Sequence, residues 1–305
     1  MSHTDVTVVI PTRNRAELLA TTLHSIQVAV DEARRAGWST RVLVVDDCSD
    51  DSSTIDTVRA AGFDVIRVEE HDGRNNPASA IVLGVGAATS TYVTLFGDDD
   101  IMLPRFLLAH LERLAQGYDL VAGSYLRTDS SLLTVREITL PEPSLGDLLA
   151  GSIAINDGAM VRTDLFQAGP WDASLDQQVI YPVWLTLMTL GVRATSLTEP
   201  TWLYRRHDAN ISDAPVAEDG AQRVAVVAPF RAAYLDRGER VPASREQIRL
   251  DEVAAYAEEM RRTAEAAAAS KAEAARLARV AWDATPWPRR TAIRVRRRVR
   301  RALSR

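Results

Sequence analysis

An apolar segment that runs directly into three aspartates limits what this 305-residue chain can fold into. Residues 92–96, Tyr-Val-Thr-Leu-Phe, are typical of a buried β-strand, and Gly97, which allows a sharp turn, separates them from Asp98–Asp100. Three adjacent carboxylates repel one another, so a hard divalent cation bound among them would explain their arrangement. The alternative interpretation is an acidic loop that caps a helix beginning near Leu103.

The same order, a strand and then polar residues and a helix, recurs through residues 6–117. Strands are predicted at 6–10, 41–45, 63–68 and 92–96, and helices at 16–36, 77–88 and 103–117. This alternation predicts an α/β fold in which helices cover both faces of a mainly parallel sheet. Small residues in the helix at 77–88 allow it to pack closely on that sheet. The loops after the strands gather at one edge, where such folds bind ligands.

The loops after the first three strands contain residues suited to a nucleotide. Pro11 ends the first strand, and the cationic loop with Arg13 suits an anion such as phosphate, although a solvated turn has the same pattern. Asp46 and Asp47 end the second strand, where a carboxylate can accept hydrogen bonds from a ribose hydroxyl or a base N–H. Most of the Asp and Ser residues that follow are interpreted as helix caps. Arg74 lies in the polar loop after the third strand.

Four segments in order resemble the family 2 glycosyltransferases, which have the GT-A fold. They are VTVVIPTRNR (6–15), VLVVDDCSDDS (42–52), the helix entry Arg74–Gly84 and YVTLFGDDDIMLP (92–104). The resemblance implies a Rossmann-like domain whose DXD motif, here within Asp98–Asp100, binds Mn²⁺ or Mg²⁺ together with the donor's diphosphate. The nucleotide-sugar site that it implies consists of Pro11, Arg13, Asp46, Asp47, Arg74, Asp98 and Arg206.

Two residues depart from the family pattern in this half. Cys48 stands where the family often has Gly, and a small buried thiol is its expected role. Gly97 stands where the family's Asp-x-Asp-Asp begins, which leaves Gly-Asp-Asp-Asp. Asp99 is therefore expected to be the principal metal ligand, with Asp98 or Asp100 as the second.

The second half carries the acceptor side of the resemblance. Strands are predicted at 119–125, 132–138, 192–197 and 201–204, and a helix at 142–149. Gly169–Asp172 (Gly-Pro-Trp-Asp) stands in place of the family's Gly-Phe-Asp-Glu. Trp171 within it serves either as a core anchor or as a stacking platform for a sugar ring.

The family's catalytic base is missing from its expected position. Glu-Asp should stand five and four residues before Trp184, but Val179 and Ile180 are found there and neither accepts a proton. Asp176 is the first candidate for the base that deprotonates the acceptor, and Asp172 is the second. The missing base also favours two alternatives, a retaining enzyme on the same fold or a nucleotide-sugar-binding partner that has lost catalysis.

A closing motif completes the resemblance. Tyr204–Ser212 (YRRHDANIS) matches the family's Tyr-Arg-x-His-x-x-Asn-x-Ser. The resemblance makes His207 a third metal or diphosphate ligand, since neutral imidazole suits Mn²⁺. Arg205 and Arg206 are placed where they can bind phosphate.

Charge and composition suggest how the chain is divided. The predicted parts are a GT-A domain at 1–213 (a nucleotide-sugar half at 1–117 and an acceptor half at 118–213), a helical extension at 214–288 and a basic tail at 289–305. The tail holds nine arginines and no acid, so the remainder of a chain with net charge −5 carries −14. The tail either lies on an anionic membrane surface or is a solvated segment. Nucleic acid is not expected to bind, because no aromatic residues alternate with the arginines.

The sequence thus predicts a bacterial, metal-dependent glycosyltransferase of the hexosyltransferase type. It would transfer a sugar from a UDP- or dTDP-linked donor to an acceptor hydroxyl with inversion, in polysaccharide, glycolipid or natural-product glycosylation. A single cysteine excludes an internal disulfide, and the first residues lack the pattern of a secretory signal. The expected location is the cytoplasm, or the inner face of the membrane if the tail binds lipid.

Overall fold

The computed structural model describes residues 4–69, 77–151, 153–155, 158–172, 175, 179–208, 210 and 226–233. The chain divides into two units, Met1–Arg249 and Leu250–Arg305, and all the described residues belong to the first. The predicted boundaries at residues 213 and 288, and the basic tail, lie outside the described residues. Part of the predicted helical extension is described, because residues 226–233 form a helix whose Val227 is buried in the core.

Strands and helices alternate through the N-terminal half. The elements are β1 Val6–Thr12, α1 Ala16–Arg35, β2 Thr40–Asp46, α2 Ser53–Ala60, β3 Asp64–Arg67, α3 Ala78–Gly86 and β4 Tyr92–Leu95. β1 lies between β2 and β4, β3 pairs with β2, and all three pairings are parallel. These pairings confirm the predicted parallel sheet of this half. The β-branched apolar run of β1 is buried, as expected for a strand covered on both faces.

The C-terminal half turns the sheet into a mixed one. Its elements are β5 Ile101–Met102, α4 Phe106–Leu114, β6 Leu120–Thr128, β7 Thr134–Ile138, α5 Leu145–Ala150, β8 Ala159–Arg162, α6 Thr163–Gln167, α7 Tyr181–Thr189 and β9 Ala194–Arg205. The strand order among the described residues is β3-β2-β1-β4-β8-β6-β9-β5, with β7 paired to β6. β8 runs antiparallel to both β4 and β6, whereas β6 and β9 are parallel.

Two details of this half differ from the sequence prediction. The predicted strands at 192–197 and 201–204 form the single strand β9, whose pairing with β6 shifts register opposite Gly123 and Tyr125. A register shift lets a strand continue through an irregular stretch that a sequence pattern treats as a break. The two-residue strand β5, which pairs antiparallel with β9, was not predicted because two residues are too short to give a pattern.

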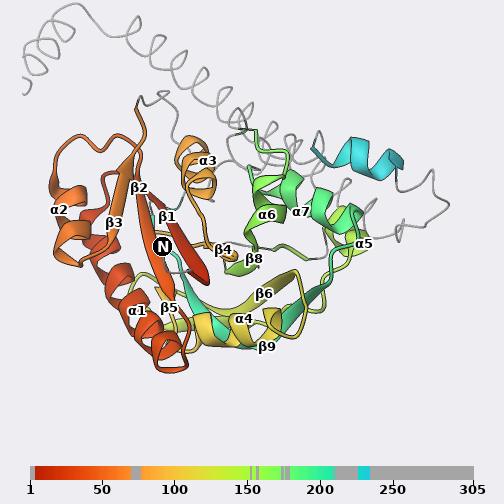
Figure 1. Cartoon of the computed structure of the whole chain (residues 1–305), viewed down its shortest axis with the longest axis horizontal. Helices are drawn as coiled ribbons and strands as arrows, with labels where there is room; N and C mark the ends of the chain where they lie inside the picture. The colour runs from red at the N-terminus through yellow and green to blue at the C-terminus, as the bar shows by residue number, and fades with distance from the viewer. Residues whose placement is uncertain are drawn as a thin grey trace, which may run out of the picture. The chain divides into compact units, whose positions relative to one another are not determined.

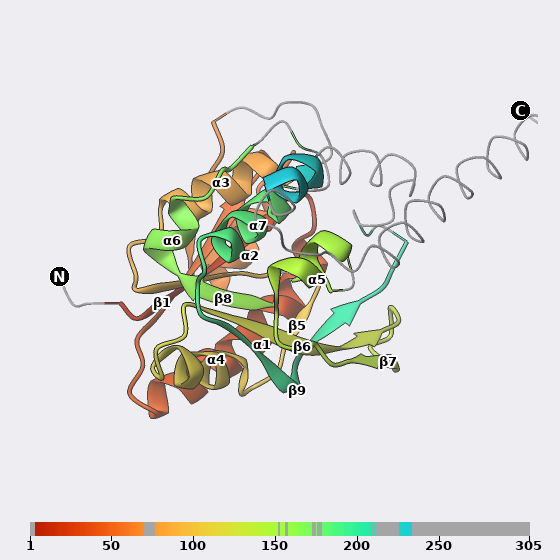
Figure 2. The same cartoon turned by 90° about the vertical axis from the view of Figure 1, so that its right-hand side faces the viewer.

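Helices cover both faces of the sheet (Figure 1). One face packs against α1, α2 and α4, and the other against α3, α5, α6 and α7. Figure 2 shows α3, α6, α7 and α5 above β8 and β6, and α4 on the other side of these strands. The predicted close approach of α3 is confirmed, because a Cβ on Gly84 would lie 2.4 Å from Cγ1 of Val9.

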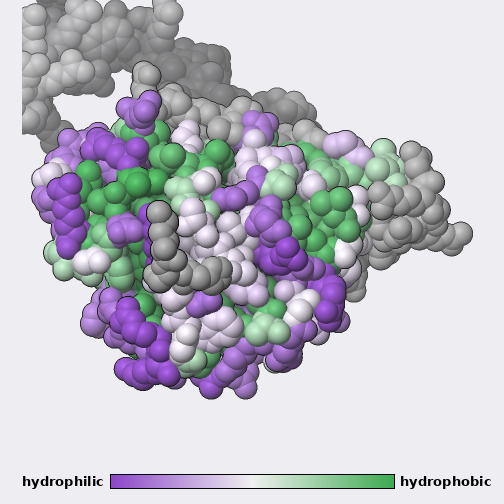
Figure 3. All heavy atoms as spheres, in the orientation of Figure 1, coloured by the Kyte–Doolittle hydropathy of each residue, from purple (hydrophilic) through white to green (hydrophobic). Residues whose placement is uncertain are grey.

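Helix α1 shows how the sequence pattern sets this layering. Its buried residues recur at helical spacing: Leu19, Thr22, Leu23, Ile26, Ala29, Val30 and Ala33. The side of α1 turned to solvent is hydrophilic, at the lower left of Figure 3. Within the described part of the chain, no helix has the length and apolar character needed to cross a membrane.

Candidate active site

Three buried carboxylates lie at the carboxyl end of β4. Asp98, Asp99 and Asp100 are 5%, 8% and 3% exposed. Gly97 is not in the left-handed region, so the turn does not require glycine for its backbone angles. A Cβ at Gly97 would instead lie 3.1 Å from both Oδ1 of Asp99 and Oδ2 of Asp100. A side chain at this position would crowd the carboxylates, so the structure relates Gly97 to the room around Asp99 and Asp100 and not to the backbone angles of the turn.

Arg15 bridges two of these carboxylates from the start of α1. Its Nη1 donates to Oδ1 of Asp98 at 2.9 Å and to Oδ2 of Asp99 at 3.0 Å. Thr12 donates its hydroxyl to the other oxygen of Asp98 at 2.7 Å. Arg13 was the residue predicted from this loop, and Arg15 was not predicted. The excess of cationic residues after β1 was the signal for it, but only the fold shows which arginine faces the aspartates.

The carboxyl group of Asp98 has a raised pKa. Burial raises its pKa to about 6; Arg15 opposes the shift and the neighbouring Asp99 adds to it. The ion pair with Arg15 therefore only partly offsets the desolvation of this carboxylate. A further cation bound at this loop would favour the ionised form of Asp98.

The end of β9 closes the site from the other side. Nε2 of His207 lies 3.0 Å from Oδ2 of Asp99, and the backbone N–H of Arg205 donates to Oδ1 of Asp100 at 2.9 Å. The fold thus brings His207 and the aspartates together from segments more than 100 residues apart in the chain. Buried Thr22 of α1 supports the loop, with its hydroxyl 2.8 Å from the carbonyl oxygen of Asp100.

The loop after β2 lies beside the loop after β1. Asp46 is fully buried; it pairs with Nη1 of Arg67 at 3.2 Å and accepts from the backbone N–H of Ser49. These contacts give Asp46 a structural task in holding its loop. Asp47 is 6% exposed, and its backbone N–H donates to the carbonyl of Thr12 at 2.9 Å, which fixes it next to the β1 loop.

The remaining donor-side residues lie at the same sheet edge or outside the described part. Pro11 is the penultimate residue of β1 and is half-buried, and Nη2 of Arg13 lies 3.8 Å from Oδ1 of Asp50. Nε of Arg13 is buried without a hydrogen-bond partner. Arg74 lies outside the described residues. Cys48 has φ of 56°, in the left-handed region, which explains why the family uses Gly at this position.

The acceptor side has no counterpart to this cluster within the residues described there. Val179, where the family has Glu, is buried, and Ile180 is the residue before the first turn of α7. Asp172 is exposed, and Asp176 lies outside the described residues. Nε1 of Trp171 donates to the carbonyl of Phe166 at 2.8 Å, and the two rings pack edge to face with centroids 4.8 Å apart. These contacts favour the core-anchor interpretation of Trp171.

The predicted metal ligands suit an ion that shares its coordination with a substrate. Among the residues that the structure describes, no group of three or more His, Cys, Asp or Glu side chains could hold a metal by itself. Mg²⁺ and similar ions often take only one or two protein ligands and complete their shell with phosphate oxygens and water. Asp99 and His207 fit such a partial set, because a carboxylate and an imidazole meet at 3.0 Å at the strand end.

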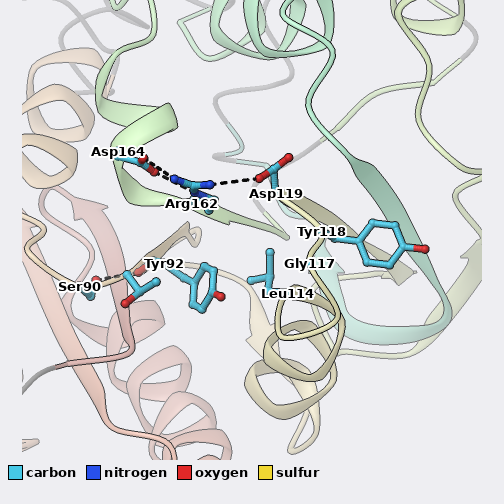
Figure 4. A pocket seen from close by; sticks show the side chains of 9 residues that line it. Ser90, Tyr92, Leu114, Gly117, Tyr118, Asp119, Arg162 and Asp164 are labelled. Atoms are coloured by element: carbon cyan, nitrogen blue, oxygen red, sulfur yellow. Dashed lines mark hydrogen bonds and ion pairs between the residues drawn. The ribbon is translucent and has the colours of Figure 1, made fainter.

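Cavities lined by described residues open near the strand ends. One of about 280 Å³ is lined by Arg127, Thr128, Asp129, Ser130, Val135, Arg206, His207 and Asp208, and His207 in its wall contacts Asp99. In it, Arg206 contacts Tyr204, with Nη1 3.4 Å from the phenol oxygen. A larger cavity of about 470 Å³ lies beside the amino end of β4, away from the aspartates, where Arg162 bridges Asp119 and Asp164 (Figure 4).

Solved structures share this fold. S. aureus TarS 1–349 matches with a TM-score of 0.55 and 17% identity over 74% of this chain, and the chain covers only 65% of that fragment. The same fragment has been solved in complex with UDP and with UDP-GlcNAc. Mannosyl-3-phosphoglycerate synthase from Rubrobacter xylanophilus matches with a TM-score of 0.50 and 19% identity, over 78% of this chain and 76% of that one. These matches confirm the GT-A-like fold.

Sequence comparison gives the family. No curated protein sequence matches the chain. The model of glycosyl transferase family 2 matches residues 7–166, which include β1, the aspartate loop and the strands up to β8. Because this match spans more than half of the 305 residues, the chain belongs to glycosyl transferase family 2, which confirms the predicted glycosyltransferase class.

Proposed function

We propose that this protein transfers a sugar from a UDP- or dTDP-linked donor to an acceptor hydroxyl, with Mn²⁺ or Mg²⁺ as cofactor. The observation that carries the proposal is the cluster of buried Asp98–Asp100 with Arg15 and His207 at the carboxyl end of β4. A site rich in carboxylates, with cationic side chains around it, suits a metal bound together with a diphosphate. That TarS has been solved with UDP supports a uridine nucleotide.

Each residue has a proposed task in donor binding. Asp47 contacts the base or ribose, while Arg13, Arg74 and Arg206 face the phosphates. Asp99 is the principal metal ligand, and His207 contacts the metal or the diphosphate. A bound divalent ion supplies positive charge to the leaving diphosphate, so the aspartates act on the leaving group and not as nucleophiles.

The proposed acceptor chemistry is a single displacement with inversion. The acceptor oxygen attacks the anomeric carbon, the bond from that carbon to the diphosphate oxygen breaks, and a carboxylate removes the acceptor's proton. Asp176 is the first candidate for that carboxylate and Asp172 the second. Acceptors of this class are hydroxyl groups of a saccharide, a lipid-linked glycan or a small molecule, and contact of residues 289–305 with the cytoplasmic membrane face would favour a lipid-linked one.

Thermal stability across a panel of nucleotide sugars tests the donor site. Wild type, Asp99→Asn and the exposed control Asp56→Asn are melted with UDP-, dTDP- and GDP-sugars, each in Mn²⁺, in Mg²⁺ and in EDTA. A ligand at 100 times its dissociation constant adds about 2.7 kcal/mol of stability, which is several degrees. We expect one nucleotide to stabilise wild type and Asp56→Asn only with metal, and Asp99→Asn not at all. Absence of any shift in wild type would refute the donor site.

Val179 and Ile180 at the expected base position favour a second candidate, a retaining transferase on the same fold. The anomeric configuration of the product, read by NMR from the coupling of its anomeric proton, separates the two. An inverted product supports the proposal, and a retained one replaces it with the second candidate.

A further inference from the structure

The hairpin formed by β6 and β7 exposes large apolar side chains at its end. Leu133 is 67% exposed and Val135 is 69% exposed, and these two residues are here called the apolar tip. Turns usually carry polar residues or glycine, because they lie in water. Figure 2 shows the end of the hairpin extending past α4 and α5. Neighbouring apolar side chains in such a place favour contact with another molecule or with a membrane.

The turn holds the apolar tip in a fixed shape. Oδ1 of Asp129 accepts from the backbone N–H of Ser131 at 2.9 Å and from that of Leu133 at 3.0 Å. The N–H of Asp129 donates to the carbonyl of Leu133 at 3.0 Å. Between them, Leu132 has φ of 64°, in the left-handed region that favours glycine or asparagine. Strained residues of this kind persist where their surroundings fix them, and they are frequent at binding sites.

Two arginines face each other behind the apolar tip. Arg127 of β6 and Arg136 of β7, here called the arginine pair, are exposed and directly opposite in the antiparallel ladder. Like charges at opposed positions repel and destabilise the hairpin. Neither guanidinium has a hydrogen bond or an ion pair with any residue that the structure describes. Glu137 is opposite Leu126 and so lies on the other face of the hairpin, which leaves the arginine pair available to an external anion.

Two other occupants fit this surface less well than a lipid bilayer does. A second copy of the chain could add a strand to β7, which pairs only with β6 among the described strands. The ladder shifts register next to Thr128, however, so Val135 forms a bulge, and bulges and charges on an edge strand oppose such pairing. A soluble anion would leave the apolar tip in water. A bilayer with anionic headgroups offers hydrocarbon to the tip and phosphates to the arginine pair.

We propose that the β6–β7 hairpin docks this protein on an anionic lipid bilayer, with its apolar tip inserted at the interface and its arginine pair on the lipid phosphates. Arg127 and Val135 also line the cavity of about 280 Å³ that contains His207. Docking therefore places this cavity beside the membrane surface, where a lipid-linked acceptor would present its hydroxyl. The surface is separate from residues 289–305, and the inference goes beyond the proposed function because lipid binding requires neither donor nor transfer.

Sedimentation with vesicles tests the docking surface. The full-length chain, without nucleotide, is mixed with vesicles of phosphatidylcholine or of phosphatidylcholine with phosphatidylglycerol. Leu133→Ser and Arg136→Gln change the hairpin, and Leu190→Ser at the end of α7 and Arg59→Gln on α2 are the controls, because both wild-type residues are exposed. We expect Leu133→Ser to weaken binding to the mixed vesicles about ten-fold and Arg136→Gln about five-fold. The controls should bind as wild type does, and all four variants should keep the wild-type melting temperature.

A dye on the apolar tip separates docking of the hairpin from binding through the basic tail. In a Cys48→Ser background, Leu133→Cys or Val28→Cys on α1 is labelled with nitrobenzoxadiazole, whose emission shifts to the blue in an apolar environment. We expect the mixed vesicles to shift the emission at position 133 and not at position 28. An unshifted emission at 133, together with vesicle binding that is equal in all variants, means that the tail alone binds lipid and overturns the inference.

The inference and the proposed function fail in different ways. Wild type that does not sediment with either kind of vesicle overturns the docking surface, even if it transfers a sugar in solution. If Arg136→Gln then weakens the binding of a phosphorylated acceptor, the arginine pair binds a soluble anion instead. Vesicle binding that follows the expected order in a protein without transferase activity defeats the proposed function and supports the docking surface.

Discussion

The donor half and the acceptor half of this molecule use their polar residues differently. At the donor end of the sheet, Arg15 and His207 contact the carboxylates of Asp98 and Asp99 within 3.0 Å. At the start of α7, the positions where the family has acids hold Val179 and Ile180, and Val179 is buried. Polar side chains thus define the first site, and apolar packing defines the described part of the second.

The difference follows from what each half must recognise. Every nucleotide diphosphate sugar presents two phosphates, so the donor half needs cations and carboxylates at fixed places. Acceptors share only a hydroxyl, and a general base contributes only a part of the rate enhancement. In this chain the family pattern is accordingly kept at the donor end of the sheet and absent at Val179 and Ile180.

The largest expected effect tests whether the acceptor half has kept a base in a shifted position. Asp176→Asn removes the proposed proton acceptor and should lower kcat about 10²–10⁴-fold with little change in nucleotide affinity. Asp172→Asn, which changes an exposed carboxylate nearby, is the control and should retain most activity. If Asp172→Asn loses activity and Asp176→Asn does not, the order of the two candidates is reversed. If neither variant loses activity, the acceptor half supplies no carboxylate base from this segment.

A smaller effect, on stability, tests how tightly the donor half is organised. Arg15→Ala leaves Asp98 and Asp99 without their shared cation, and should lower the free energy of unfolding by about 3 kcal/mol in the absence of metal. Arg35→Ala breaks an exposed ion pair with Glu32 and should lower the free energy of unfolding by no more than about 0.5 kcal/mol. Urea denaturation at pH 7 measures both. Equal losses in the two variants would mean that Arg15 is not an essential partner of the aspartates.

The same contrast explains what could be predicted from the sequence. Alternating apolar runs and the motif order were enough to place β1 to β4, the parallel sheet and the edge at which the aspartates lie. They were not enough to distinguish Arg15 from Arg13, because both follow β1 and only the packing of α1 decides which guanidinium reaches Asp98.

Long-range pairing was the other limit. The insertion of β8 between β4 and β6 and the two-residue strand β5 depend on contacts between distant segments, which leave no local pattern. The contact of His207 with Asp99 was expected only because the closing motif resembled the family's. Trp171 remained open between two roles, since a large aromatic side chain serves either.

The boundary between the halves should respond to acid. His110 of α4 is fully buried, with Nδ1 2.7 Å from the carbonyl oxygen of Phe106 and Nε2 3.1 Å from that of Gly158, the residue before β8. Burial lowers the pKa of His110 to about 4. The unfolded chain, with an ordinary histidine pKa near 6.5, binds the proton more readily, so stability falls as pH drops from about 6.5 towards 4.

Because of this histidine, the free energy of unfolding should be about 2 kcal/mol lower at pH 5 than at pH 7. The raised pKa of Asp98 acts in the opposite direction, so the measurement is the difference between wild type and His110→Gln in urea denaturation at both pH values. His110→Gln should lose less stability than wild type between pH 7 and pH 5. Equal losses would show that the imidazole is already protonated in the folded protein.

The smallest effect concerns Trp171, which either stacks on a sugar ring of the acceptor or only packs in the protein core. If Trp171 is a core anchor, Trp171→Phe loses the hydrogen bond to Phe166 and keeps an aromatic ring, so stability should fall by about 1 kcal/mol while KM for the acceptor stays unchanged. A stacking platform would behave in the reverse way, with KM raised several-fold in Trp171→Ala and unaltered stability in Trp171→Phe. Because the ring already packs edge to face on Phe166, we expect the first result. The opposite result would mean that the acceptor half, like the donor half around Asp99, recognises its substrate through specific side-chain contacts.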